Sequence, residues 1–215
     1  MKAIFFNEPV EDFYLGDQFY EIFKDRIYAP YIYGKQDLTI VDIGANIGIA
    51  TLYFSRFAKK VVSVEPSAEH FELLKSMVEY NKLENVTLIN KAIYINQGNF
   101  TLYHPPNKTA YSLMSNISQI SQSNEMVDAI TLDDLFKENN LNHVDLLKVD
   151  IEGTEIEVFS HTSFKNIADK VDLVITERHN WTGRNPNQLK EALKNAGFTV
   201  EQIPNSADLL VAKRI

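Results

Sequence analysis

The stretch Val41-Asp42-Ile43-Gly44-Ala45-Asn46-Ile47-Gly48 decides the fold, because it joins an apolar run to an amphipathic one through two glycines. Residues 38–43 are apolar enough for a buried strand, and residues 47–58 have helical spacing. Gly44 permits the positive φ of a tight turn, and Gly48 lets a ligand or the sheet lie close to the helix. The first turn of that helix presents free backbone N–H groups. The stretch therefore predicts a ligand site at the carboxyl end of the strand.

The residues around the first glycine narrow the class of ligand. A dinucleotide fingerprint requires Gly-x-Gly-x-x-Gly, but Asn46 stands at the second glycine position and Ile49 at the third. Asp42 stands two residues before Gly44, where a carboxylate would repel a pyrophosphate and could receive an ammonium group. The pattern therefore favours a ligand with an amino-acid end over one with a diphosphate.

A second carboxylate, Glu65, ends the next predicted strand, residues 60–64. It lies 65 − 44 = 21 positions after Gly44, near the spacing of about 20 expected for a residue that binds the hydroxyls of a ribose. Pro66 then starts the following helix. Glu65 could instead only cap that helix. We favour the ribose role, because the strand, the glycine turn and the carboxylate occur together.

Predicted strands and helices alternate along the rest of the chain. The patterns predict strands at 86–89, 144–149 and 171–176, and helices at 67–81, 132–139, 155–160 and 186–196. They also predict a hairpin of 92–95 with 100–103, an edge strand at 126–130, and an antiparallel pair of 198–203 with 209–213. Apolar strands separated by helices indicate an α/β fold, a three-layer α-β-α sandwich around a mostly parallel sheet. Ligands bind such sheets at the carboxyl ends of the strands.

The chain is expected to form one main domain, 38–215, preceded by a helical, aromatic-rich cap, 1–37. Within the cap, residues 17–29 have helical spacing and stop before Pro30. The cap carries more aromatic residues than one helix needs, which predicts that it covers the substrate side of the sheet or forms a homodimer contact. The Ser-, Asn- and Gln-rich segment 104–125 is expected to be a long surface loop and a candidate lid, with Tyr111 and Met114 facing the substrate.

Composition and charge exclude several classes of protein. The 215 residues are 45% hydrophobic and 23% charged, as in globular domains. The absence of cysteine excludes disulfides, thiolate metal sites and cysteine nucleophiles, and it fits a reducing compartment. No signal-peptide pattern and no apolar run of membrane-span length occur, so we expect a cytoplasmic protein with no membrane span. The net charge of −8 and the lack of a basic run disfavour a nucleic-acid partner.

Several motifs, taken together, resemble one enzyme family. They are Asp42-Ile43-Gly44-Ala45-Asn46-Ile47-Gly48, Val64-Glu65-Pro66, Asn90-Lys91-Ala92-Ile93, Thr131-Leu132-Asp133-Asp134 and Leu147-Lys148-Val149-Asp150-Ile151-Glu152-Gly153-Thr154-Glu155. Their order and spacing, from about residue 38 to about residue 213, resemble the FkbM-type S-adenosylmethionine-dependent methyltransferases. The resemblance implies the class I methyltransferase fold, a Rossmann-like seven-stranded sheet whose last strand is antiparallel.

The resemblance also implies S-adenosylmethionine as the cofactor and assigns residues to it. The motif residues up to Gly48 would surround the methionine part, Glu65 would hold the ribose hydroxyls, and the segment 90–92 would grip the adenine. The implied cofactor-binding set is Asp42, Gly44, Ala45, Asn46, Gly48, Glu65, Pro66, Asn90, Lys91, Ala92 and Asp150.

Four residues at predicted strand ends are candidates for catalysis. They are Asp150, Glu152, Glu177 and His179. Asp150 should face the reacting methyl group, and His179, Glu177 or Asp150 could act as the general base for a hydroxyl. Glu155 is better explained as a helix cap, and Lys148 by a buried salt bridge with a carboxylate. The four candidates could together bind a divalent metal, but nothing in their spacing demands one, and we expect none.

The implied activity is methyl transfer to a hydroxyl of a sugar, a glycan or a secondary metabolite. The sequence after the fourth strand, Asp150-Ile151-Glu152-Gly153, lacks the Asn/Asp-Pro-Pro-Tyr/Phe tetrapeptide, which argues against methylation of exocyclic base amines. Two alternatives remain open at this point. One is a non-catalytic module that binds S-adenosylmethionine, and the other is an NAD-type oxidoreductase, which the missing glycines disfavour.

Overall fold

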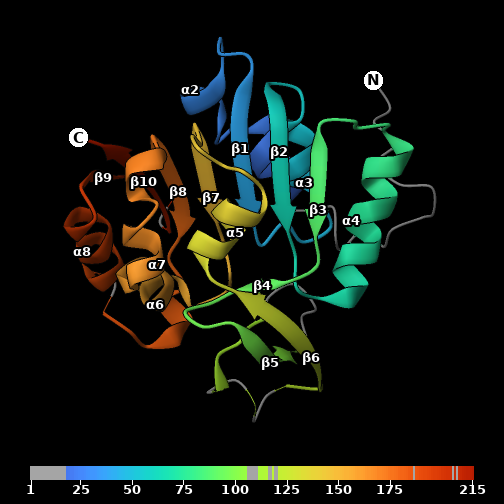
Figure 1. The fold of residues 1–215 in the computed structure, drawn as a ribbon, viewed down its shortest axis with the longest axis vertical. Helices are drawn as coiled ribbons and strands as arrows, with labels where there is room; N and C mark the ends of the chain where they lie inside the picture. Colours follow the sequence, from blue (N-terminus) through green and yellow to red (C-terminus); the bar gives the residue numbers. More distant parts are fainter. Residues whose placement is uncertain are drawn as a thin grey trace.

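The strand 38–43 lies in the interior of the sheet, and all six of its residues are buried (Figure 1). The computed structural model describes residues 18–105, 111–115, 118, 121–185, 187–204, 206 and 208–215. The seven-stranded sheet has the order β3-β2-β1-β7-β8-β10-β9. Its strands are β1 (Leu38–Ile43), β2 (Ala58–Val64), β3 (Val86–Ile89), β7 (Leu146–Val149), β8 (Leu173–Glu177), β9 (Phe198–Gln202) and β10 (Leu209–Arg214).

The pairing of the strands confirms the predicted fold class. β1 pairs in parallel with β2 and β7, and the register sets Asp42 opposite Lys148. β10 is antiparallel to both β8 and β9. The sheet is therefore mostly parallel, with an antiparallel last strand inserted between β8 and β9.

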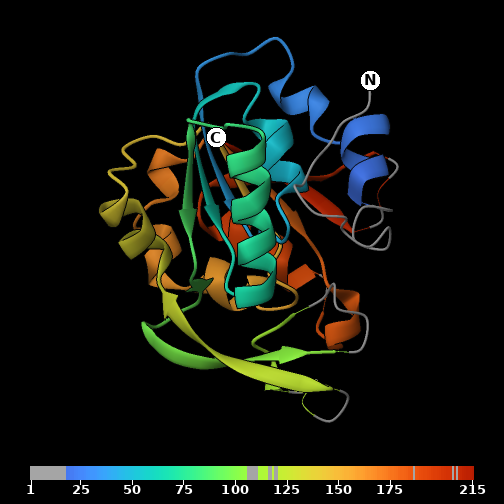
Figure 2. The same ribbon diagram turned by 90° about the vertical axis from the view of Figure 1, so that its right-hand side faces the viewer.

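Two hydrophobic clusters cover the two faces of the sheet and make the three layers. One face packs against α2 (Ala29–Ile32), α3 (Ile49–Phe54) and α4 (Ala68–Tyr80), and its cluster contains Ile40, Phe54 and Leu74. The other face packs against α5 (Leu132–Glu138), α6 (Glu155–Ser160), α7 (Thr162–Lys165) and α8 (Asn187–Asn195). Figure 2 shows the sheet between these layers. Among the described residues, no helix has the length and apolarity needed to cross a lipid bilayer.

A second, three-stranded sheet lies beyond the carboxyl ends of β1, β2 and β7 (Figures 1 and 2). It contains β4 (Ala92–Ile93), β5 (Gly98–His104) and β6 (Ser123–Ile130), in the order β4-β6-β5. The predicted hairpin of 92–95 with 100–103 is therefore wrong. β6, expected at an edge, lies in the middle, because its alternating buried residues pack against both neighbours.

The described part of the segment 104–125 contains regular structure that the prediction of a surface loop did not include. β5 extends to His104, β6 begins at Ser123, and Ser112 forms an isolated bridge with Tyr103. Tyr111 and Ser112 are buried. The rest of the segment lies largely outside the described residues. The described part of the segment therefore packs against the small sheet.

Two predicted helices differ from the structure. Residues 17–29 were expected to form one helix, but the described part contains a π-helical turn, η1 (Tyr20–Lys24), and then α2. Pro30 stands in the first turn of α2, where its missing N–H costs nothing, so it begins a helix instead of ending one. The helix predicted at 47–58 is only α3, because β2 already starts at Ala58.

Candidate active site

The turn after β1 brings β1 and β7 into direct backbone contact. Gly44 has a φ of 72°, and a Cβ at this position would lie 1.7 Å from the carbonyl oxygen of Asp150. Gly48 has a φ of 95° and packs α3 against α4, because a Cβ there would lie 2.3 Å from the Cε of Met77. Only glycine fits either position without displacement. Gly44 thereby fixes Asp150 at the edge of the sheet, whereas Gly48 has a packing role.

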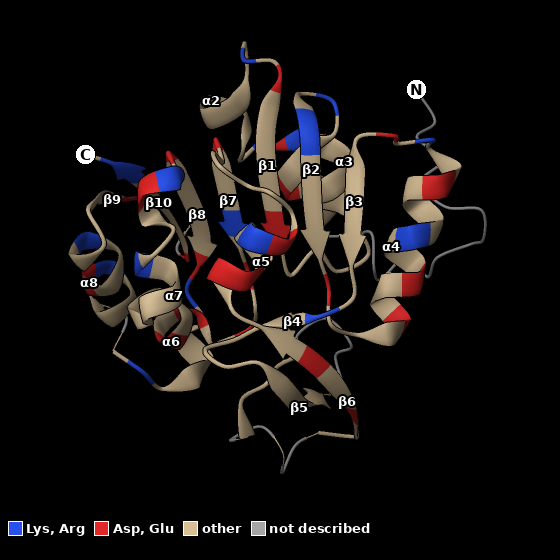
Figure 3. Cartoon of the chain, viewed as in Figure 1, with Lys and Arg blue, Asp and Glu red and all other residues tan. Residues whose placement is uncertain are grey.

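A buried ion pair lies behind this turn. The Lys148 ammonium lies 3.3 Å from Asp42 Oδ1 and 3.6 Å from Asp150 Oδ2, and it donates to the carbonyl oxygen of Gly44 at 2.7 Å. Burial lowers the pKa of Lys148, but the charges of Asp42 and Asp150 outweigh burial and raise the pKa above its usual value, so the amine is an ammonium. The predicted salt bridge of Lys148 is confirmed. Figure 3 shows the two charges on the neighbouring strands β1 and β7.

Asp42 faces the protein and not a cavity. Its Oδ2 accepts a hydrogen bond from the Thr51 hydroxyl at 2.7 Å, and the residue is fully buried. The ammonium that its carboxylate receives is that of Lys148. Asp42 therefore supports the glycine turn from behind, and a direct contact with the cofactor stays a prediction.

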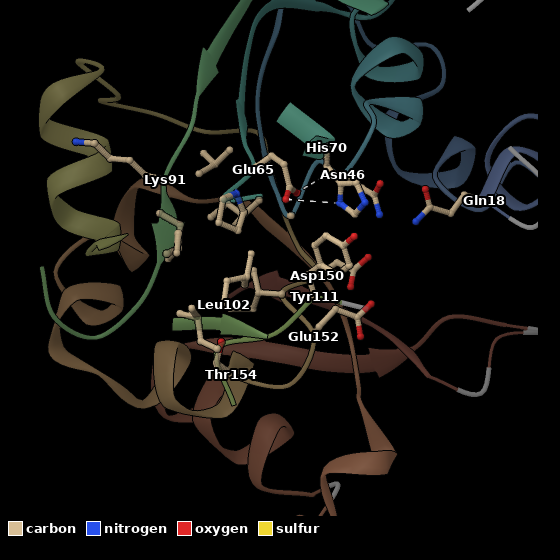
Figure 4. Close-up of a pocket in the computed structure, with 18 residues that line it drawn as sticks. Gln18, Asn46, Glu65, His70, Lys91, Leu102, Tyr111, Asp150, Glu152 and Thr154 are labelled. Atoms are coloured by element: carbon tan, nitrogen blue, oxygen red, sulfur yellow. Dashed lines mark hydrogen bonds and ion pairs between the residues drawn. The ribbon is translucent and has the colours of Figure 1, made fainter. Parts of the chain in front are cut away.

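A cavity opens between the turn after β1 and the small sheet (Figure 4). Its polar wall contains Asn46, Glu65, Asp150 and Glu152, and Figure 4 shows these side chains directed toward one space. Its apolar wall contains Ala92, Ile93, Leu102 and Leu113. Gln18, from the amino-terminal segment, closes one side. We call this the first cavity. It combines an apolar slot with carboxylates, which suits a nucleoside that carries a polar tail.

Glu65 is held in the first cavity by backbone donors. Its Oε2 accepts from the N–H of Asn46 at 2.9 Å, and its Oε1 accepts from the N–H of Ser67 at 2.9 Å. Each carboxylate oxygen still has a lone pair for a ligand hydroxyl. Burial raises the pKa of Glu65 to about 7, although the two backbone bonds oppose the shift. Hydroxyl donors such as those of a ribose would therefore stabilise the ionised form of the Glu65 carboxylate.

The remaining predicted cofactor residues take different places. Pro66, Lys91 and Ala92 line the first cavity, and Ala45 lines a second cavity beside it. Asn90 lines neither cavity. Its amide donates to the carbonyl oxygens of Glu65 and Pro66 at 2.9 and 3.0 Å, so it braces the Glu65 loop.

A stack of three side-chain rings forms part of one wall of the first cavity, and no sequence motif predicts this stack. The Tyr111 ring lies between His70, with centroids 4.4 Å apart, and His104, with centroids 4.0 Å apart. His104 Nε2 lies 3.0 Å from Glu125 Oε1, and His70 Nδ1 lies 3.9 Å from Glu65 Oε1. The stack ties α4 to the small sheet. Tyr111, predicted with Met114 to form a lid or acceptor wall, lines the first cavity and not the second, so its role toward the acceptor stays a prediction.

His179 lies among three carboxylates. Its Nε2 is 3.1 Å from Glu152 Oε2 and 3.5 Å from Asp150 Oδ1, and its Nδ1 is 2.9 Å from Glu155 Oε1. Burial lowers the pKa of His179, but the contacts with Glu152 and Glu155 outweigh burial and raise it to about 12. The ring is therefore an imidazolium at neutral pH. An imidazolium cannot accept a proton, which argues against the proposed base role of His179.

Glu155 has both the predicted structural role and one that the sequence did not suggest. Its carboxylate accepts from the backbone N–H groups of Ile151 and Gly153, each at 3.0 Å, as expected of a cap. The same carboxylate contacts His179. Glu152 has a φ of 56°, and its carbonyl oxygen accepts from the Ser112 hydroxyl at 2.5 Å. The small sheet therefore helps to hold Glu152 in its left-handed conformation.

Ligand atoms of Asp150, Glu155 and His179 lie within 4.8 Å of one another, which is close enough for a metal ion. The same side chains also pair with one another, since His179 contacts both carboxylates directly. The expectation that no metal is required stays a prediction.

The second cavity adjoins the first. The two cavities share Gln18, Gly44, Asn46 and Asp150. Glu21, Ile22 and Tyr28 form its outer wall, from the amino-terminal segment, and Glu177 lies at its inner wall. Burial, and then the charge of Asp150, raise the pKa of Glu177 to about 8. Asp150 lies at the boundary between the two cavities, with Glu152 on the wall of the first and Glu177 on the wall of the second. His179 lines neither of them and contacts Asp150 and Glu152.

Comparison with known proteins identifies relatives of the whole domain. A family model described as a methyltransferase FkbM domain matches residues 42–200. "Methyltransferase 1" of Beauveria bassiana is 29% identical over 84% of this chain and 79% of its own length. A hexuronic acid methyltransferase, AglP, of Haloferax volcanii is 24% identical over 84% of this chain and 72% of its own length.

Solved structures share the fold. A methyltransferase FkbM of Methylobacillus flagellatus superposes with a TM-score of 0.57 and 13% identity, over 82% of this chain and 43% of that longer chain. A Streptococcus mutans protein solved in complex with SAH superposes with a TM-score of 0.53 and 12% identity, over 89% of this chain and 96% of that one. The chain therefore shares its fold with these two proteins.

Proposed function

Because the chain belongs to the FkbM methyltransferase family, we propose that it transfers a methyl group from S-adenosylmethionine to a hydroxyl oxygen of a small molecule or glycan. One observation carries the proposal. The first cavity, with Glu65, and the second cavity, with Glu177, meet at Asp150. A methyl donor and a methyl acceptor need two such adjoining spaces that share a boundary.

The residues of the first cavity fit an adenosyl cofactor. Glu65 has lone pairs free for ribose hydroxyls, and its neutral-range pKa falls when hydroxyl donors arrive. Ala92, Ile93 and Leu102 provide an apolar slot for a planar base. S-adenosylmethionine supplies a methyl group activated by a sulfonium. Asp150, at the boundary, is in place to orient the acceptor toward that group.

Glu177 is the general base in this proposal. Its carboxylate faces the second cavity, and the described residues give it no hydrogen bond and no ion pair. A base whose pKa lies near the working pH is efficient, and Glu177 has a pKa of about 8. Glu177 would take the proton that the acceptor hydroxyl loses. His179, held as an imidazolium, would keep Glu152 and Asp150 in place and balance their charge.

The test is a transfer assay with S-adenosylmethionine and a panel of sugars and polyols, with S-adenosylhomocysteine as the measured product. We expect turnover with at least one hydroxylated acceptor. We expect Glu177→Gln to lower kcat by a factor of about 10² to 10⁴ while it leaves cofactor affinity unchanged. Full activity of Glu177→Gln would remove Glu177 from the mechanism. Cofactor binding without turnover of any acceptor would favour a non-catalytic module.

Two further properties are proposed from the sequence alone. The cysteine-free composition supports a cytoplasmic location, which cell fractionation would test. The aromatic amino-terminal segment was expected to cover the substrate side or to form a homodimer contact. Its described part contributes Glu21 and Tyr28 to the second cavity. A homodimer stays possible in our proposal, and sedimentation at several concentrations would decide it.

A further inference from the structure

Two carboxamide side chains, those of Gln18 and Asn46, line both the first and the second cavity. Asn46 belongs to the turn after β1, whereas Gln18 lies two residues before η1 (Tyr20–Lys24). Figure 4 shows their amide groups directed toward each other. Of the described residues, Gly44 and Asp150 are the only others common to both cavities. A ligand that reaches from one cavity into the other therefore meets both amides.

The backbone fixes which end of the Asn46 amide is available to a ligand. Asn46 Oδ1 accepts from the N–H of Ile47 at 2.7 Å, a bond that only the oxygen of the amide can accept. The Asn46 backbone N–H donates to Glu65 at 2.9 Å, and its φ of 51° is one that asparagine adopts more readily than most residues. The Nδ2 group has no hydrogen bond within the described residues. Its two N–H donors are therefore available to a ligand.

Gln18 supplies a second amide of the same kind. Its side chain is partly buried at the cavity wall, and it forms no hydrogen bond with the residues that the structure describes. A carboxamide offers two N–H donors and a carbonyl acceptor without a charge. Two such groups facing one space can donate to both oxygens of a carboxylate.

Asp150 determines which end of a zwitterion would face these amides. Its Oδ1 is buried and has no hydrogen bond within the described part of the chain, although His179 Nε2 lies 3.5 Å away. The Asp150 carboxylate attracts an ammonium and repels another carboxylate, whereas amide N–H groups stabilise a carboxylate. A ligand with both charges would therefore turn its ammonium toward Asp150 and its carboxylate toward Gln18 and Asn46.

We propose that Gln18 and Asn46 bind the carboxylate of the cofactor's amino-acid end through their amide N–H groups, and that Gln18 thereby joins the amino-terminal segment to the bound cofactor. The inference rests on the proposed function and deepens it. The resemblance in sequence assigns Asn46 to the methionine part of the cofactor but assigns no residue to the carboxylate, and it gives Gln18 no role.

The test compares three adenosyl thioethers that differ in the amino-acid end. S-adenosylhomocysteine carries both charges, its decarboxylated analogue S-adenosyl-3-thiopropylamine keeps only the ammonium, and methylthioadenosine has neither. Each is titrated calorimetrically into the full-length protein and its Gln18→Ala variant. We expect Gln18→Ala to weaken S-adenosylhomocysteine binding about tenfold or more and the binding of the other two less than about twofold, because a hydrogen bond to a charged group is lost only with the carboxylate. Equal weakening of all three, or no weakening, would overturn the inference.

Asn46→Asp tests the second amide with little change in the turn. Aspartate can keep the acceptor for the Ile47 N–H and tolerates the left-handed conformation, but it replaces the amide donor by a carboxylate oxygen. S-adenosylhomocysteine binding should weaken at least about tenfold relative to methylthioadenosine binding, which reports any effect on the nearby Glu65. An unchanged ratio would contradict the role of Asn46. Gln188→Ala, at an exposed position of α8, is the matched control for Gln18→Ala and should leave all three affinities unchanged.

The same titrations separate the inference from the proposed function. If the unmodified protein bound none of the three compounds, the proposed function would be contradicted, and the inference with it. If the protein bound them but both variants changed all three affinities alike, only the inference would be overturned. An intact S-adenosylhomocysteine affinity in Gln18→Ala, with a raised KM for the acceptor, would also overturn it and would place Gln18 on the acceptor side of the boundary.

Discussion

Glu177 and His179 stand close together at the end of β8, yet their surroundings favour a cation at His179 and the neutral acid at Glu177. His179 is held as a cation by Glu152 and Glu155, whereas Glu177 is buried beside other acids and has a pKa of about 8. The sequence could place both residues at the ligand edge of the sheet, because they follow a buried parallel strand. It could not assign their protonation, which depends on neighbours from β7, α6 and the turn between them.

The pH dependence of turnover distinguishes the two residues. Because the base must be ionised, kcat should rise with pH through about 8 in assays that contain a metal chelator. Glu177→Gln should abolish this rise, and His179→Asn should lower the rate but retain the rise. A pH profile governed by a group near pH 6.5 that disappears in His179→Asn would contradict the assignment.

Through Glu177, a rise in pH should lower the stability of the protein, whereas it should raise its activity. Folding raises the pKa of Glu177 from 4.5 to about 8, so the ionised side chain is less stable in the folded state. The free energy of unfolding should therefore fall as pH rises from about 4.5 to about 8. Glu177→Gln should raise this free energy by roughly 1–3 kcal/mol at pH 8.5 and by little at pH 4.5. Thermal unfolding at both pH values measures it, and an equal effect at the two would refute the account.

Two rings of the stack, those of His70 and His104, could not be predicted because their neighbours come from distant parts of the chain. His70 lies on α4, His104 ends β5, and Tyr111, which the sequence did single out, follows β5 in the chain. Their stacking depends on how the small sheet packs against α4. No local periodicity or motif carries that information, whereas Glu65 and Asp150 were predictable from their positions directly after strands.

At the level of elements, the strands of the main sheet were predictable and the small sheet was not. β1, β3 and α6 were predicted with the bounds that the structure gives, and β1 is buried along its whole length. The turn signal at residues 96–99 suggested a local hairpin, but β5 pairs with β6 and leaves β4 to pair with the far side of β6. Local turn chemistry was overridden by the alternation of buried residues in β6.

The glycine turn between β1 and α3 can be tested with a matched pair of substitutions. Gly44 and Gly197 both have positive φ, but only at Gly44 does a Cβ meet backbone, at 1.7 Å from the Asp150 carbonyl oxygen. Gly197→Ala should cost about 1–2 kcal/mol for backbone strain alone. Gly44→Ala should cost clearly more and should also abolish binding of S-adenosylhomocysteine. Equal losses of melting temperature in the two variants would show that the close approach of β1 and β7 is unimportant.

At the scale of the whole molecule, the described part of the amino-terminal segment, from residue 18 onward, packs into the domain core and lines the second cavity. The Tyr28 ring packs on Phe54 with centroids 4.9 Å apart, and Phe23 packs on Tyr53 at 5.3 Å. The sequence suggested a cap by its excess of aromatic residues. It could not show that the cap and the sheet edge enclose a cavity together.

This arrangement predicts different effects for two tyrosines. Tyr28→Ala removes a buried ring from the cavity wall and should lower the free energy of unfolding by roughly 3–5 kcal/mol. It should also raise the KM for the acceptor while the affinity for S-adenosylhomocysteine changes little. Tyr33→Ala, at a position that is 76% exposed, should change neither. A loss of cofactor affinity in Tyr28→Ala larger than the change in acceptor KM would contradict the division between the two cavities.

The central claim is that the first cavity binds an adenosyl cofactor through Glu65. The most direct measurement is calorimetric titration of the protein and of its Glu65→Ala variant with S-adenosylmethionine and S-adenosylhomocysteine, with NAD as the control. The account predicts micromolar binding of both sulfur compounds, no binding of NAD, and a loss of about 1–3 kcal/mol of binding free energy in the variant. Absence of binding by both sulfur compounds, or equal affinity in Glu65→Ala, would contradict it.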